Sequence, residues 1–339
     1  MKVALVTSGQ LANRAGAARH VRALAHGLTE RGADVELLTQ RSPALLLRLV
    51  ASSFDVADVH SADARLALAV IRGGARRCVF TPHAPIQRLA AWPHARTTAT
   101  AIARASETVC NSSYERDVLC ERFPGAVGRV SVIPVTVDVD AIRAARPFPL
   151  TGRVVLAVGR LDRGKRIDRA IAAMASLEAD FRLVVAGTGP LLHRLQAHAA
   201  DLRVSSRVEF VGPVGDAELY RWLRSAAAVV ALHDDHSSGL HVAEALAAGA
   251  SVVASELPVH REAAARFAGA RVKFVSRGSP FEVADAITEL ARPGACFASS
   301  AGRAVVPSPD RVVDRVWDLY RRLIEGGRPI THLPQIRVA

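Results

Sequence analysis

Short apolar runs rich in valine alternate along the whole chain with longer segments of helical periodicity. The runs in the first half are Val3–Thr7, Val35–Thr39, Val56–Ser61, Cys78–His83, Thr108–Asn111 and Val130–Val135. Those in the second half are Val154–Val158, Leu183–Ala186, Val208–Val211, Ala228–Leu232, Ser251–Ala254 and Val272–Val275. Such runs are typical of strands buried on both faces, although periodicity alone does not exclude buried helix. We interpret them as parallel strands.

The segments between these runs predict helices. Ala17–Arg31 gathers its apolar side chains on one face and is followed by Gly32, a residue typical of helix C-termini. Asp310–Ile324 has the pattern of a final amphipathic helix. Strand–helix alternation predicts parallel sheets with right-handed crossovers, and two such series predict two doubly wound α/β domains. The join is expected within Ile142–Thr151, which contains two prolines.

Length and composition agree with this architecture. At about 150 residues per domain, a chain of 339 residues corresponds to two domains. Half of the residues are hydrophobic and 22% are charged, as in ordinary globular proteins. The net charge of +12 can attract phosphorylated substrates, acidic membranes or nucleic acid. Nucleic acid is disfavoured because no dense Lys/Arg tract is interleaved with aromatic residues.

The cysteines and the lengths of the apolar runs indicate the cellular compartment of the protein. None of the four cysteines forms a CxxC pair, so no zinc site is expected, and scattered single cysteines fit a reducing cytoplasm. The apolar run in the opening segment MKVALVTSG is too short for a signal peptide. No run of 18 apolar residues occurs, so we expect a cytoplasmic protein without a membrane span.

The segment Ala226–Ser255 carries the most chemistry. A polar loop, His233–Ser238, leads from a strand into a helix that starts near Gly239 and Leu240, where free backbone N–H groups can bind a phosphate. Glu244 lies in this helix among apolar residues, where an acid needs a partner. The ribose attached to a diphosphate at the helix start would lie within its reach. A solvated surface glutamate is the alternative.

Two cations follow another predicted strand. The loop after the apolar run of Val154–Ile167 contains Arg160 and Lys165, at the carboxyl edge where ligands bind in this architecture. These side chains can neutralise a diphosphate leaving group as its charge develops. Taken alone, such a pair in a chain with 44 Lys and Arg residues is better explained as two surface cations.

Weaker signals lie at the ends of other strands. Gly187 and Gly189 precede a helix, and a tight turn explains them as well as a phosphate does. The loop Ser8–Gly16 lacks the spacing of a dinucleotide fingerprint, which disfavours NAD. His60 and His83 each end a strand of the first sheet, which is consistent with a cleft at that edge.

Together these segments resemble glycosyltransferase family 4, whose members are retaining enzymes of the GT-B fold. The strongest matches are GRLDRGK at Gly159–Lys165 and SGLHVAEALAAGASVVAS at Ser238–Ser255. Ala15–Thr39 matches the first helix and second strand of the family, and Arg129–Asp138 matches the segment before the interdomain linker. The resemblance implies two facing Rossmann-like, doubly wound domains. These are an acceptor-side domain at 1–145, a nucleotide-sugar-binding domain at 146–315, and a return helix and tail at 316–339 that cross back to the first domain.

The resemblance also implies an activity. A hexosyl-type sugar would pass from a nucleotide diphosphate sugar to a small hydroxyl-bearing acceptor with retention, without metal or further cofactor, and a UDP-sugar is favoured over a GDP-sugar. His83 would lie beside the reacting sugar carbon, while Arg160 and Lys165 would contact the diphosphate. The nucleotide would be bound by Gly16, Val214, Gly239, Leu240 and Glu244, the last of which would hold the ribose hydroxyls.

Three positions depart from the family pattern. The first glutamate of the Glu-x7-Glu motif is replaced by His236, and the usual Gly-Phe that follows is Ser237-Ser238. The glycine that often follows the motif lysine is Arg166. We expect His236, Ser237 and Ser238 to contact the donor sugar and to change donor choice or turnover, while the nucleotide half of the site stays intact.

Alternatives remain open for the reaction and the acceptor. The alternatives are an epimerase-like GT-B enzyme, a protein that only binds nucleotide sugars, and a glycosyltransferase that acts on a lipid acceptor. A lipid-modifying enzyme would contact the membrane surface through a stripe of basic and apolar residues. The preferred interpretation of the same stripe is a helix that faces the core. That stripe comprises Arg41, Leu45, Leu46, Arg48, Leu49 and Val50. A small soluble acceptor, such as a cyclitol or a natural-product intermediate, is favoured, and the sequence does not determine the oligomeric state.

Overall fold

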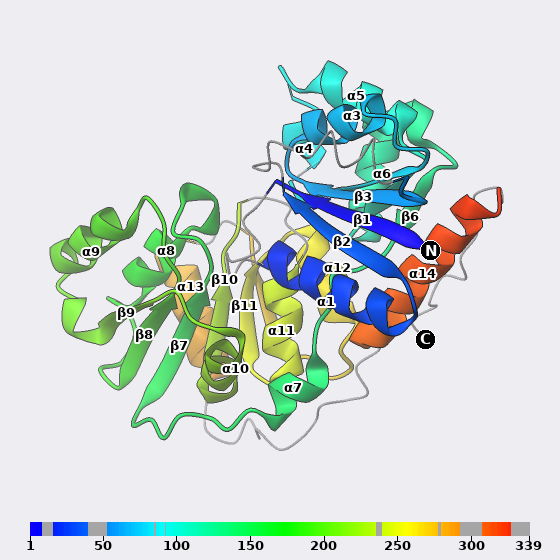
Figure 1. Cartoon of the computed structure of the whole chain (residues 1–339). Coiled ribbons are helices and arrows are strands. Elements are labelled where there is room, and N and C mark those ends of the chain that lie inside the picture. The colour runs from blue at the N-terminus through cyan, green and yellow to red at the C-terminus, as the bar shows by residue number, and fades with distance from the viewer. Residues whose placement is uncertain are drawn as a thin grey trace. The chain divides into compact units, whose positions relative to one another are not determined.

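The computed structural model describes residues 1–8, 16–39, 53–84, 86–91, 93–234, 239–276, 279–291 and 307–326. The described residues form two compact units, one from Met1–Thr136 and Pro307–Ala339 and the other from Val137–Val306 (Figure 1). Each unit contains a six-stranded sheet in which every described strand pairing is parallel. The predicted class, two doubly wound α/β domains, is therefore confirmed.

The sheet of the first unit has the strand order β2-β1-β3-β4-β5-β6. Its strands are β1 Lys2–Thr7, β2 Asp34–Thr39, β3 Val56–Ser61, β4 Cys78–Pro82, β5 Glu107–Cys110 and β6 Val130–Val132. The order reverses between β1 and β3, and the carboxyl ends of strands at such a switch point form the usual binding crevice. Gly16 begins the helix that comes after β1 in the chain, and His60 lies near the end of β3.

The sheet of the second unit has the order β12-β11-β10-β7-β8-β9, with its switch point between β7 and β10. Its strands are β7 Arg153–Val158, β8 Phe181–Ala186, β9 Val208–Gly212, β10 Ala228–Ala231, β11 Ser251–Ser255 and β12 Val272–Val275. Every predicted strand is present, with ends shifted by a few residues. The run Val130–Val135 stops being a strand at Val132 because Pro134, two residues on, has no N–H to donate. His83 follows β4 instead of ending it.

Helices cover the sheets of both units. Those of the first are α1 Gly16–Glu30, α3 Ala64–Arg72, α4 Ile86–Leu89, α5 Ala95–Arg104, α6 Ser113–Arg122 and α14 Pro309–Ile324. Those of the second are α7 Val139–Ala144, α8 Ile167–Ala173, α9 Leu192–Asp201, α10 Asp216–Ser225, α11 Leu240–Ala247, α12 Pro258–Ala265 and α13 Pro280–Leu290. Short 3₁₀ turns occur at Pro124–Ala126, Arg163–Lys165 and Ser205–Arg207.

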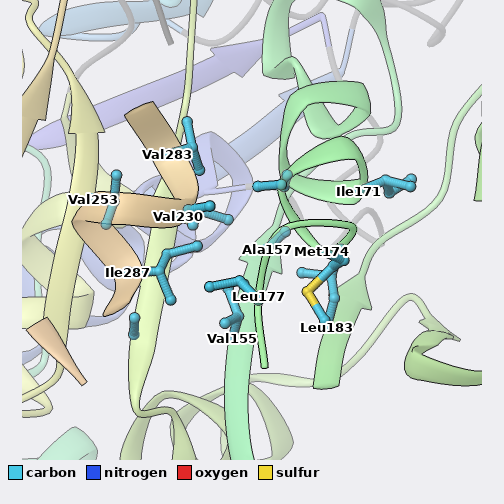
Figure 2. Packing of buried hydrophobic residues seen from close by; sticks show 14 of the residues in the cluster. Val155, Ala157, Ile171, Met174, Leu177, Leu183, Val230, Val253, Val283 and Ile287 are labelled. Carbon is cyan, nitrogen blue, oxygen red and sulfur yellow. The ribbon is translucent and has the colours of Figure 1, made fainter. Parts of the chain in front are cut away.

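The continuous apolar runs are explained by burial on both faces of each sheet. In β7, Val155 and Ala157 pack with residues of α8 and α13, as Figure 2 shows for Ile171 and Ile287. Val154 and Leu156, which alternate with them, pack into a second cluster with α10, α11 and α12. Successive side chains of a strand point to opposite faces, so both sets of positions must be apolar.

The final helix, α14, belongs to the first unit, as the resemblance implied. It packs on α1 at Gly27, where an added Cβ would lie 2.7 Å from a methyl of Val313. A guanidinium nitrogen of Arg31 donates to Asp314 at 2.8 Å beside this contact. The glycine therefore lets the two helices approach closely, and the side chain of Tyr320 reaches the core of the unit, where it is fully buried.

One expectation falls on a part of the chain outside this description. The apolar stripe between Arg41 and Val50 lies outside the described residues, so its interpretation as a core-facing or membrane-surface helix stays a prediction. Among the residues that are described, no helix is long and apolar enough to cross a membrane.

Candidate functional site

Two loops at the switch point of the second sheet are held together. The loop after β7 contains Arg160 and Lys165, and the loop after β10 contains His233 and Asp234. The backbone N–H of Asp234 donates to the carbonyl of Gly164 at 3.0 Å. The cations predicted to bind a diphosphate are therefore placed beside the loop that leads to α11.

Arg166 joins the same two loops through its side chain. Its guanidinium contacts Asp234 at 2.9 Å and Asp168 at 3.3 Å. Its backbone has a φ of 49°, in the left-handed region that favours glycine, the residue usual here in the family that the sequence resembles. The two carboxylate contacts offset the conformational cost, so this departure from the pattern has a structural role.

Lys165 and His241 lie beside the same stretch of backbone at Gly159. A Cβ added to Gly159 would meet the Lys165 side chain at 3.6 Å and the Nε2 atom of His241 at 3.7 Å. Arg160 differs, because its side chain is 73% exposed and its Nε lies 3.6 Å from Asp162 Oδ2. Its charge faces solvent, where a bound anion can reach it.

Helix α11 brings its first residues and Glu244 to this edge. Gly239, just before the helix, has a φ of +66°, and a Cβ there would lie 2.8 Å from the carbonyl oxygen of Val259. Packing against α12 therefore requires this glycine, beyond the ligand approach expected from the sequence. Glu244 is 4% exposed and lies 3.6 Å from Nδ1 of His241, one turn earlier on the helix. Sequence reasoning expected a partner for this acid but did not name His241, although the i, i+3 spacing is a signal for it.

Further histidines surround this corner of the second unit. The ring of His233 lies 5.5 Å from that of His241 and 5.2 Å from that of His260, measured between centroids. Burial, with smaller effects from Lys165, His241 and His260, holds the pKa of His233 well below its ordinary value. Lys165, Arg166 and His233 also border a small hollow at this corner.

The glycines at 187 and 189 have a packing role. A Cβ on Gly187 would lie 1.9 Å from the carbonyl oxygen of Gly159, and one on Gly189 would lie 2.5 Å from that of Leu161. The N–H of Leu161 also donates to the carbonyl of Thr188 at 3.0 Å. These glycines let the loop after β8 pack against the loop after β7, which favours the tight-turn explanation over a phosphate contact.

The other predicted residues are spread over both units. Leu240 is the first residue of α11, and Val214 lies between β9 and α10 against an apolar cluster. Gly16 begins α1 in the first unit. His236, Ser237 and Ser238, expected to contact the donor sugar, lie outside the described residues.

In the first unit, the half-buried His83 belongs to a cluster of polar side chains. Its Nε2 lies 3.0 Å from Nδ1 of His60, whose Nε2 lies 3.3 Å from Asp58 Oδ2. Asp58 also accepts hydrogen bonds from the hydroxyls of Thr81, at 3.3 Å, and Tyr320, at 2.5 Å. Sequence reasoning identified the two histidines but missed Asp58 and Tyr320.

A third histidine, His20 on α1, packs against the same group. Its ring centroid lies 5.8 Å from that of His60 and 6.3 Å from that of His83. Burial is the main cause that holds the pKa of His20 well below its ordinary value, with His60 and His83 contributing. Burial and the neighbouring His60 lower the pKa of His83 to about 3. Both rings are therefore neutral near pH 7.

Two matches to known families cover most of the chain. Residues 138–292 match the family described as "Glycosyl transferases group 1", and residues 40–141 match "Glycosyltransferase Family 4". The chain belongs to glycosyltransferase family 4. The resemblance identified from the sequence is confirmed.

Relatives of this family 4 chain include two with inositol-containing names. D-inositol 3-phosphate glycosyltransferase 1 of Catenulispora acidiphila is 32% identical over 251 residues, or 67% of this chain and 60% of the relative. The GDP-mannose-dependent alpha-(1-6)-phosphatidylinositol dimannoside mannosyltransferase of Mycobacterium tuberculosis is 32% identical over 186 residues, or 51% and 46% of the two chains. The family 4 chain spans about half the length of the curated relatives it matches.

Solved structures share the fold of this family 4 protein at low sequence identity. Sucrose-phosphate synthase from Thermosynechococcus elongatus has a TM-score of 0.81 and 18% identity, over 96% of this chain and all of that one. Anabaena Alr3699/HepE in complex with UDP has a TM-score of 0.76 and 16% identity, over 95% of this chain and 100% of that one. These likenesses agree with the predicted GT-B fold.

Among the residues of the family 4 protein that the structure describes, no group of three or more His, Cys, Asp and Glu side chains is arranged to hold a metal ion. The clustered histidines at both sheet edges instead face one another, hydroxyls or carboxylates.

The neutral buried histidines predict that this family 4 protein loses stability in mild acid. Because the folded-state pKa values of His20, His83 and His233 lie below 6.5, the unfolded chain binds protons there that the folded chain cannot. The free energy of unfolding should therefore fall as the pH drops below 6.5, by up to about 1.4 kcal/mol per pH unit for each histidine. Urea unfolding between pH 7.5 and 4.5 measures this slope.

Two variants isolate the contribution of His83 to that slope. His83→Gln should reduce it by about 1.4 kcal/mol per pH unit, because one depressed pKa is removed. His26→Gln, at a position whose side chain is 79% exposed, should leave it unchanged. A slope that is equal in wild type and His83→Gln would show that His83 does not titrate below 6.5 in the folded protein.

Proposed function

We propose that this chain is a retaining glycosyltransferase that moves a hexosyl-type sugar from a nucleotide diphosphate sugar to a small hydroxyl-bearing acceptor. The observation that carries the proposal is the gathering of Lys165, His241 and Glu244 at the start of α11, on the switch-point edge of the second sheet. A family 4 chain with cations and a carboxylate at such an edge has the groups needed to hold a nucleoside diphosphate.

The leaving diphosphate would be stabilised by three features. The N–H groups at the start of α11 have no partner within the helix and can donate to phosphate oxygens. Lys165 adds a positive charge beside Gly159, and Arg160 adds one from the exposed side of the loop. As the bond to the sugar breaks, negative charge grows on the diphosphate, so these groups stabilise the transition state more than the ground state.

The nucleoside end would be held by Glu244 and Val214. Glu244 lies four residues after Leu240, a rise of about 6 Å along the helix, which is the spacing between a phosphate and the far hydroxyls of its ribose. Its carboxylate can accept hydrogen bonds from two vicinal hydroxyls. Val214 would offer an apolar contact to the base from the loop before α10. Gly16 would approach the phosphates from the first unit, and His83 would contact the donor sugar.

The acceptor is proposed to be a cyclitol or its phosphate. The names of two relatives support this choice, because one acts on D-inositol 3-phosphate and the other on a phosphatidylinositol dimannoside. The second name, with the net charge of +12, favours a lipid acceptor at a membrane surface as the second candidate. A UDP-sugar donor stays a prediction, and the GDP-mannose dependence of that relative places GDP-sugars in the same donor panel.

The reaction is proposed to take place in the cytoplasm. The described cysteines, Cys78, Cys110 and Cys120, are all free thiols. Free thiols of this kind fit a reducing compartment.

Activity should survive removal of divalent metal ions. Cationic side chains and a helix start do the neutralising in the proposed site, so incubation with EDTA should leave the rate of hexosyl transfer nearly unchanged. The rate is measured by chromatography of the released nucleoside diphosphate, with UDP- and GDP-hexoses as donors and an inositol phosphate as acceptor. Loss of activity with EDTA and its return with manganese would contradict the metal-independent mechanism.

A further inference from the structure

The first unit contains a buried chain of side chains that ends on His83. We propose that His60 is a positioning residue for His83, held in one protonation form by Asp58 and by Tyr320 of the return helix α14. This inference rests on the proposed function, in which His83 contacts the donor sugar. These side chains come from β3, from the segment after β4 and from α14, whose Tyr320 is 262 residues from Asp58 in the sequence.

Asp58 fixes the direction of the hydrogen bonds. The residue is 2% exposed, and its carboxylate accepts from the hydroxyls of Tyr320 and Thr81. Burial alone raises the pKa of Asp58, but the charge that His60 carries when it is protonated, the close contact with His60 and the hydrogen bonds from Tyr320 and Thr81 outweigh it and leave the pKa below the ordinary value. Asp58 is therefore ionised and can only accept.

Tyr320 can only donate to this carboxylate. Its side chain is fully buried, and burial together with the charge of Asp58 raises the pKa of its hydroxyl well above the ordinary value. The hydroxyl therefore keeps its proton and donates it to Asp58 Oδ2 across 2.5 Å. Because Tyr320 lies on α14, the return helix holds the carboxylate in place.

The contact between His60 and Asp58 also determines which nitrogen of His83 carries a proton. The Nε2 of His60 lies 3.3 Å from the carboxylate of Asp58, within ion-pair range but outside hydrogen-bond geometry. In a ring that carries one proton, the negative charge of Asp58 favours that proton on Nε2 and leaves a lone pair on Nδ1. That lone pair lies 3.0 Å from Nε2 of His83, which must then carry the proton of the second ring. Nδ1 of His83 is left as a hydrogen-bond acceptor for a ligand. Asp58, Tyr320 and His60 therefore favour the tautomer of His83 that accepts a hydrogen bond from a sugar hydroxyl.

His20 packs beside this chain without competing for its hydrogen bonds. Its Nδ1 lies 3.4 Å from the hydroxyl of Thr136 and receives the backbone N–H of the same residue at 3.4 Å. The ring contacts His60 and His83 through its edge. It therefore excludes water from the pair and leaves the direction set by Asp58 unchanged.

The tautomer of His83 is measured by two-bond ¹H–¹⁵N correlation on protein labelled with ¹⁵N-histidine at pH 8, with the signals assigned through His83→Asn. We expect Nε2 of His83 to be protonated and Nδ1 not. His60→Leu removes the acceptor, so His83 should populate both tautomers and turnover should fall about tenfold, the loss of one well-placed hydrogen bond. His60→Gln should restore the wild-type tautomer and most turnover, because its amide can donate to Asp58 only and must turn its oxygen to His83.

Several results would overturn the proposal. A proton on Nδ1 of His83 in the wild type does so without any variant, so the test survives a His60→Leu protein that fails to fold. An unchanged His83 tautomer in folded His60→Leu, or a changed tautomer with unchanged turnover, also overturns it. The exposed His26→Gln should alter neither readout. The spectra need no substrate, so failure of the proposed function is recognised separately, as absent turnover in a wild type with the expected His83 tautomer.

Discussion

Lys165→Ala is expected to slow glycosyl transfer by roughly 30- to 1,000-fold, about 2–4 kcal/mol in the barrier, while the protein stays folded. Lys165 lies beside Gly159 at the edge where the diphosphate is proposed to bind. Its charge matters most when negative charge develops on the leaving group, so kcat should fall more than the affinity for the donor. Single-turnover kinetics with saturating donor measure the chemical step directly.

Two matched variants sharpen this test. Arg160→Ala removes the second proposed diphosphate cation and should produce a loss of the same kind. Arg163→Ala removes an exposed cation from the same 3₁₀ turn as Lys165 and should have little effect on turnover. If Arg163→Ala and Lys165→Ala behave alike, the loss reflects net charge and not a diphosphate contact. Normal turnover in Lys165→Ala would assign that lysine to the surface.

Glu244→Gln should weaken nucleotide binding by tenfold or more. The substitution keeps the size of the side chain but removes the charge that strengthens the proposed hydrogen bonds to the ribose, each worth about 1.5–3 kcal/mol. It also replaces the carboxylate that lies 3.6 Å from Nδ1 of His241. Calorimetric titration with UDP and GDP measures the affinity of the wild type and the variant.

The ligand and a neighbouring glutamate supply controls for this effect. A 2′,3′-dideoxy nucleotide should bind the wild type at least as weakly as the ordinary nucleotide binds Glu244→Gln, because it lacks both hydroxyls while the glutamine amide can still form uncharged hydrogen bonds to them. Glu262→Gln, on the adjacent helix α12, should leave nucleotide affinity unchanged, since Glu262 is paired with Arg266 at 3.1 Å. Equal wild-type affinity for the ribo and dideoxy nucleotides would refute the role given to Glu244.

The strands were predictable because both faces of each sheet are covered. Val154 and Val155 point to opposite faces of β7, and each enters an apolar cluster, so the sequence has no polar position to alternate with them. The strand ends were less predictable because they depend on hydrogen-bond geometry. His83 follows β4, and the last predicted run of the first unit stops short of Pro134. Such details depend on neighbouring strands, which a local pattern does not contain.

The partners of the site residues were less accessible from the sequence. Glu244 was expected to need a partner, and the i, i+3 spacing points to His241 once the helix is accepted. Tyr320 and Asp58 have no such local signal, because they are 262 residues apart and meet only after α14 returns to the first unit. In the sequence, Gly187 fits a phosphate-binding loop as well as a tight turn. The turn is favoured only because a Cβ added at Gly187 would lie 1.9 Å from the carbonyl oxygen of Gly159.

Retaining hexosyl transfer by this protein can be demonstrated by identifying the products of a donor panel. Wild-type protein is incubated with UDP- and GDP-hexoses and an inositol phosphate, and the mixture is analysed by mass spectrometry and by proton NMR of the anomeric signal. We expect free nucleoside diphosphate and an acceptor heavier by one hexosyl group, with the anomeric configuration of the donor kept and the reaction slowed by roughly 30-fold or more in Lys165→Ala. A donor that is bound but never cleaved, or that is epimerised without transfer, would contradict it.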